Sequence, residues 1–245
     1  MSSAPDLTSR LLRHERPIVA AGIALLVLFA WLYLLGGAGM DDGMAMQAMA
    51  PPFGALVAMW WVMMAAMMLP SAAPAILLYA RVREMRKRDS SIAQSWVFLL
   101  GYLALWLLFS LAAAGAQRLL AGPAMTLGSR WIEAAVLVAA GLYQLSPLKA
   151  ACLGECRAPA QFISRHWRPG IAGAVRLGML HGAYCVGCCW LLMGLLFVGG
   201  VMNIAWIVAL TLIVAVEKLV PGGEWVARLT GVALIAWGAA RIVIG

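Results

Sequence analysis

Residues 53–79 read FGALVAMWWVMMAAMMLPSAAPAILLY, a stretch without a single charged side chain. About 20 apolar residues are enough for a helix to cross a bilayer. Backbone groups in lipid must be satisfied within the segment, so a helix is the form we expect for this stretch. Pro70 and Pro74 give it a reason to bend. The stretch therefore predicts a membrane-spanning helix that is tilted or kinked.

Comparable apolar runs fill most of the remaining chain. Hydrophobic residues make up 64% and charged residues 11%, whereas about 25% of residues are charged in ordinary soluble domains. We expect an all-α, polytopic integral membrane helix bundle with about seven transmembrane helices. The expected spans are Pro17–Leu35, Phe53–Tyr79, Trp96–Ala116, Trp131–Ala151, Val175–Gly199, Met202–Val220 and Trp225–Ile244.

The basic residues indicate the orientation. With a cytoplasmic N-terminus, all but three of the 18 lysines and arginines fall on the inner side, the exceptions being Arg118, Arg130 and Arg241. This bias follows the positive-inside rule. We therefore interpret the net charge of +8 as a topology signal. We expect the lipid bilayer as a partner and no nucleic acid. Residues 1–16 form the expected cytoplasmic segment, and 17–245 a single transmembrane domain with an outer loop at 36–52.

The fifth run places three cysteines and a histidine inside a segment that should lie in lipid. On a helix His181, Cys185 and Cys188 share one face, and Cys189 lies beside them. A single buried cysteine is often only a small hydrophobic side chain. Three of them within five positions, next to a histidine, are the ligands of a soft metal, Cu(I) above all.

Methionines gather in the second run at a matching depth. Their positions are Met59, Met63, Met64, Met67 and Met68. Met59, Met63 and Met67 share one helix face, and Met64 and Met68 share an adjacent face. Packing between helices is the alternative use of such a stripe. Because both sulfur groups lie near the middle of their spans, we expect them to form one site.

The fifth run also contains two glycines one turn apart. Gly178 and Gly182 form a small-xxx-small pair that lets another helix approach closely.

The outer loop carries four more methionines. They are Met40, Met44, Met46 and Met49. A linker in which methionine is merely tolerated is the alternative. Thioethers do not form disulfides, so they can bind Cu(I) in an oxidising compartment. We interpret this loop as a copper-capture segment.

Two further groups lie near the inner ends of the spans. Cys152 and Cys156 form a C-x3-C pair that could chelate a metal as a second station. Glu217 and Lys218 are about 100° apart on a helix, so they cannot pair with each other. Lys149 is a candidate partner for Glu217, and Gln144 faces the same inner half.

Two roles are open for these intramembrane charges. One is a structural ion pair, with Lys218 extending outward to the interface. The other is a cation relay.

Four blocks of sequence resemble a known bacterial family, catalogued as predicted metal-binding integral membrane proteins, a domain of unknown function. The blocks are Trp60–Ser71, Tyr143–Arg157, Gly182–Met193 and Glu217–Lys218, so the resemblance extends from about position 53 to position 220. It implies metal binding and a location in the bacterial inner (cytoplasmic) membrane. It names neither the metal nor an activity.

These observations favour a protein that captures Cu(I) outside and holds or transfers it through an intramembrane Met/Cys site. Other metals fit the ligands less well, and we do not expect an enzyme. A copper-dependent enzyme or a chaperone is a candidate partner, and the sequence predicts no oligomeric state. The alternatives are a thiol-disulfide oxidoreductase that uses Cys185, Cys188 and Cys189, with Cys152 and Cys156 as a relay, and a metal sensor or scaffold without transport.

Overall fold

A computed structural model describes residues 15–36, 52–85, 91–120 and 129–243, and within these ranges every regular element is a helix. The all-α prediction is confirmed. The helices are α2 (Glu15–Leu35), α4 (Phe53–Met85), α5 (Ser91–Leu120), α6 (Arg130–Gln144), α7 (Pro147–Arg157), α8 (Pro159–His166), α9 (Gly170–Gly194), α10 (Leu196–Gly199), α11 (Ile204–Leu219) and α12 (Gly223–Val243).

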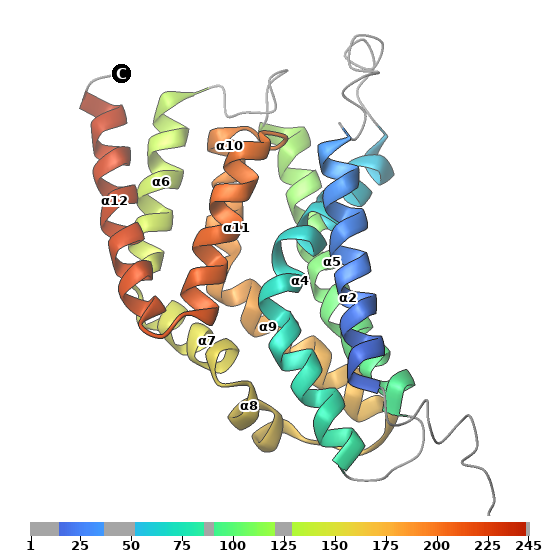
Figure 1. Ribbon diagram of the computed structural model, residues 1–245. Helices are drawn as coiled ribbons and strands as arrows, with labels where there is room; N and C mark the ends of the chain where they lie inside the picture. Colours follow the sequence, from blue (N-terminus) through green and yellow to red (C-terminus); the bar gives the residue numbers. More distant parts are fainter. Residues whose placement is uncertain (1–14, 37–51, 86–90, 121–128, 244–245) are drawn as a thin grey trace, which may run out of the picture.

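The long helices form a bundle in which the chain passes back and forth (Figure 1). Helices α2, α5, α9 and α12 run in one direction, and α4, α6 and α11 run in the other. The short helices α7 and α8 lie at one end of the bundle, where α4 and α11 also finish. These segments hold six basic residues: Arg81, Arg83, Lys149, Arg157, Arg165 and Lys218.

Five helices are long and apolar enough to cross a membrane: α2, α4, α5, α9 continued by α10, and α12. Helices α6 and α7 would add a sixth only as one bent span. The expected sixth run, 202–220, forms the 16-residue helix α11, which is shorter than the usual ~20 residues. The count of seven spans stays a prediction.

The expected straight span over 131–151 is broken. Helix α6 ends at Gln144, and α7 leaves it at an angle of 62°. The residue before a proline is disfavoured in helical conformation, and Ser146 precedes Pro147. The Ser146 side chain accepts a hydrogen bond from the Lys149 backbone N–H at 3.2 Å, capping α7. The bend turns α7, with Cys152 and Cys156, toward α9.

Glycines bring α5 and α9 into close contact. A Cβ atom at Gly101 would lie 2.6 Å from the Val175 carbonyl oxygen, and one at Gly178 would overlap the Phe98 carbonyl. At Gly182 the added atom would be 3.1 Å from the Tyr102 carbonyl oxygen. The close helix approach predicted from Gly178 and Gly182 is therefore confirmed, and α5 is the approaching helix. This contact fixes the position of the cysteines further along α9.

Candidate metal centre

The three cysteines of α9 point into the protein interior. Cys185, Cys188 and Cys189 are each 1% exposed. The thiols of Cys188 and Cys189 donate to the Cys185 carbonyl oxygen, at 3.1 and 3.0 Å. Such bonds to a carbonyl three or four residues earlier are a local alternative for a polar side chain inside a helix. The three sulfur atoms therefore lie on one buried face of α9.

A fourth thiol reaches them from α7. Cys156 lies close to both Cys185 and Cys188. Its C-x3-C partner, Cys152, is half-buried and lies against Gly187, where an added Cβ would be 2.9 Å from its sulfur. Cys152 and Cys156 therefore do not form the separate second metal site that the sequence predicts, because Cys156 lies with the thiols of α9.

One methionine of α4 completes this group. The Cys189 thiol lies 3.8 Å from the Met68 thioether sulfur. We call Met68, Cys156, Cys185, Cys188 and Cys189 the sulfur cluster. The other four methionines predicted for the site are buried in the surrounding core: Met59, Met63, Met64 and Met67.

Lys218 enters the sulfur cluster from α11. Its ammonium group lies 2.9 Å from the Cys185 sulfur, 3.4 Å from the Ser71 hydroxyl and 3.9 Å from the Met68 sulfur. The side chain is 6% exposed. Of the two roles left open, the one in which Lys218 extends outward to the interface is wrong, because three acceptors hold its ammonium inside the bundle.

Aromatic side chains enclose the cluster on the side of α5. The Tyr102 hydroxyl lies 3.1 Å from the Cys185 sulfur and 3.4 Å from the Met68 carbonyl oxygen. His181, one turn before Cys185, packs its ring against Phe98, Tyr102 and Phe162. Its Nδ1 atom is buried and has no hydrogen-bond partner among the described residues. That atom is therefore an unsatisfied polar atom one helical turn from Cys185.

The carboxylate of Glu217 contacts other partners than the sulfur cluster. It accepts from the Lys149 ammonium at 2.6 Å and from the Gln144 amide at 2.7 Å, and both charged side chains are 1% exposed. The predicted pairing of Lys149 with Glu217 is confirmed. In addition, Arg157 donates to the Glu217 carbonyl oxygen at 2.7 Å. These contacts tie α7 to α11, next to Cys156.

Sequence reasoning missed two neighbours of the cluster, Ser71 and Tyr102. It singled out Lys218 but did not place it beside the thiols. Tyr102 and Ser71 lie in apolar runs where one hydroxyl carries no periodic signal. The methionine loop at 40–49 lies outside the described residues.

The chemistry of the cluster is that of soft ligands without a carboxylate. No three His, Cys, Asp or Glu side chains in the described ranges are arranged so that they could hold a metal ion. Two of the thiols instead donate to a carbonyl. Metal binding here therefore requires these thiols to lose their protons and turn from the carbonyl toward the ion.

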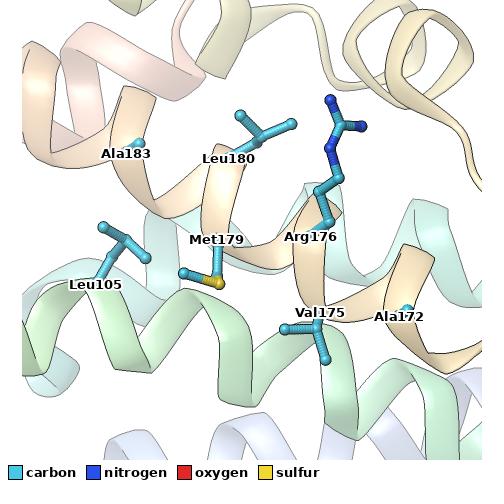
Figure 2. Close-up of a pocket in the computed structure, with 7 residues that line it drawn as sticks. All are labelled: Leu105, Ala172, Val175, Arg176, Met179, Leu180 and Ala183. Atoms are coloured by element: carbon cyan, nitrogen blue, oxygen red, sulfur yellow. The ribbon is translucent and has the colours of Figure 1, made fainter.

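A separate groove lies on the outside of the bundle between α5 and α9 (Figure 2). It has a volume of about 610 Å³ and is lined by Leu105, Ala172, Val175, Arg176, Met179, Leu180 and Ala183. These residues belong to the faces of α9 and α5 away from the cysteines. The groove therefore has no part in the sulfur cluster.

The chain was compared with known proteins. The family model described as "PpoB2: Copper chaperone" matches residues 57–241, which include every member of the sulfur cluster and Lys218. Comparisons with curated proteins and with solved structures gave no match. The match confirms the expected metal-handling family, and the description of that family names copper. The chain belongs to the PpoB2 family of copper chaperones.

Proposed function

We propose that this protein is a membrane copper chaperone that holds Cu(I) in its sulfur cluster and passes it to an acceptor. The observation that carries the proposal is the meeting of four thiols and a thioether from α4, α7 and α9 around Cys185. Thiolates and thioethers are soft ligands of the kind that Cu(I) prefers. The buried carboxylate of Glu217 is bonded to Lys149 and Gln144, so it does not compete as a hard ligand.

The proposed location is the bacterial inner membrane, with the N-terminus in the cytoplasm. Five apolar helices and many exposed apolar side chains on α2 and α12 support this location, among them Phe29, Leu35 and Leu229. The gathering of basic segments at the end of the bundle that holds α7 and α8 supports the orientation (Figure 1). The cluster then lies within the membrane.

Copper would arrive from the outer side. The methionines at 40, 44, 46 and 49 are the proposed capture segment, because thioethers stay competent where thiols oxidise. The acceptor is a copper-dependent enzyme or a second chaperone. A thiol-disulfide relay would need no thioether, whereas Met68 lies against Cys189.

The test is a competition titration of purified protein against a Cu(I) chelator under anaerobic, reducing conditions. We expect Cys185→Ser, Cys188→Ser and Cys189→Ser each to weaken Cu(I) binding. Cys156→Ser should do the same, because its thiol lies close to Cys185 and Cys188. Cys152→Ser is the matched control, since it makes the same chemical change at a thiol placed against Gly187. Unchanged affinity in the variant with all three α9 cysteines replaced would refute the proposed site.

A further inference from the structure

The ammonium of Lys218 is a positive charge built into the sulfur cluster. An ammonium has three N–H donors and no acceptor, and Lys218 has three acceptors: Cys185, Ser71 and Met68. The Cys185 sulfur, at 2.9 Å, is the nearest of them and the one that can carry a negative charge.

Two features keep this charge where it is. Lys218 lies in the last turn of α11, where the negative end of the helix dipole favours a cation. The adjacent carboxylate, Glu217, is directed toward Lys149 at 2.6 Å and is saturated by Gln144. The charge of Lys218 can therefore be balanced only by negative charge on the sulfur ligands, and it repels any cation that they bind.

From this geometry we infer that Lys218 is a specificity-determining residue, which makes the cluster select monovalent over divalent soft metals. The inference rests on the proposed function. For any fixed set of thiolates, the Cu(I) complex carries one more negative charge than the Zn(II) complex. With two thiolates the complexes have charges of −1 and 0, and adding the ammonium gives 0 and +1. A buried site penalises the uncompensated charge, so the ammonium favours Cu(I).

Zn(II) is the informative competitor because it shares the filled d shell and a strong preference for thiolates. Thiolate ligands alone therefore do not exclude it. A charge placed 2.9 Å from a ligand atom discriminates between the two ions where ligand softness does not. The interaction is strong because the side chain is buried, away from the screening of water.

The experiment measures the ratio of the Zn(II) and Cu(I) dissociation constants in detergent-purified, reduced protein. Each metal is titrated against a chelator of known affinity. In Lys218→Met and Lys218→Gln, which remove the charge, we expect the ratio to fall by about tenfold or more. Cu(I) binding should weaken and Zn(II) binding should tighten. Lys218→Arg keeps the charge and should keep most of the selectivity.

The outcomes separate this inference from the proposed function. Both metals are measured on the same preparation, so a lower folded fraction cancels in the ratio. If the wild type binds Cu(I) but the neutral variants keep its ratio, or weaken both metals equally, Lys218 does not set the selectivity. An Arg variant that loses selectivity as fully as the Met variant would show that shape, not charge, is responsible. A wild type that binds no Cu(I) overturns the proposed function itself.

Discussion

Glu217 and Lys218 are neighbours in sequence, but their side chains contact different groups. A step of about 100° around α11 sends the carboxylate to Lys149 and Gln144 and the ammonium to Cys185. The contacts of Glu217 with Lys149 and Gln144, together with Arg157, link α7 to α11, and this favours a structural role for its carboxylate. A buried ion pair of this kind matters most when one partner is removed, because the other charge is left without compensation.

We expect Glu217→Gln to destabilise the fold by about 3–5 kcal/mol, because it leaves the Lys149 ammonium buried without its counter-charge. The free energy of unfolding is measured by denaturant titration in mixed micelles. Adding Lys149→Met to Glu217→Gln should recover part of the loss, as the two positions form one coupled pair. If Glu217→Gln leaves stability unchanged but slows copper release, the carboxylate acts as a relay and its structural assignment is wrong.

Helix α9 is placed by glycines and not by its cysteines. The sequence predicts a close neighbour from Gly178 and Gly182, and the structure supplies α5. The identity of that neighbour could not be predicted, since a small-residue pair does not specify which helix fills the gap. The bend at Ser146–Pro147 was readable in principle from proline chemistry. It was missed because the run 131–151 is mostly apolar and was read as one continuous span. The position of Cys156 beside the α9 thiols was missed for the same reason.

Gly178→Ala tests whether the α5–α9 contact positions the sulfur cluster. The added Cβ would overlap the Phe98 carbonyl, so we expect a loss of about 1–3 kcal/mol from overpacking together with weaker Cu(I) binding. Gly194→Ala is the matched control on the same helix, because nothing lies within 4 Å of its added Cβ. It should leave copper affinity unchanged. Equal effects of the two variants would contradict the role of this contact.

In the part of the chain that the structure describes, the sulfur cluster is buried between the helices. The α9 thiols are 1% exposed, and Trp60, Met63 and Met64, which are fully buried, pack in the same core. At the end toward α7 the Lys149–Glu217 pair is equally buried. An ion held here has tightly packed side chains on either side of it. This arrangement suits an ion held for delivery better than an ion that passes through continuously.

Sealed proteoliposomes with an entrapped Cu(I) indicator distinguish the two modes. We expect wild-type protein to bind copper in proportion to the protein present, while the indicator inside stays unchanged. An external acceptor of higher affinity should then remove the bound copper, which is the behaviour of a chaperone. Vesicles opened with detergent confirm that the indicator responds, and the variant lacking all three α9 cysteines gives the background. Steady filling of intact wild-type vesicles, absent in that variant, would instead establish a transporter, with the buried cluster as a stage on its path.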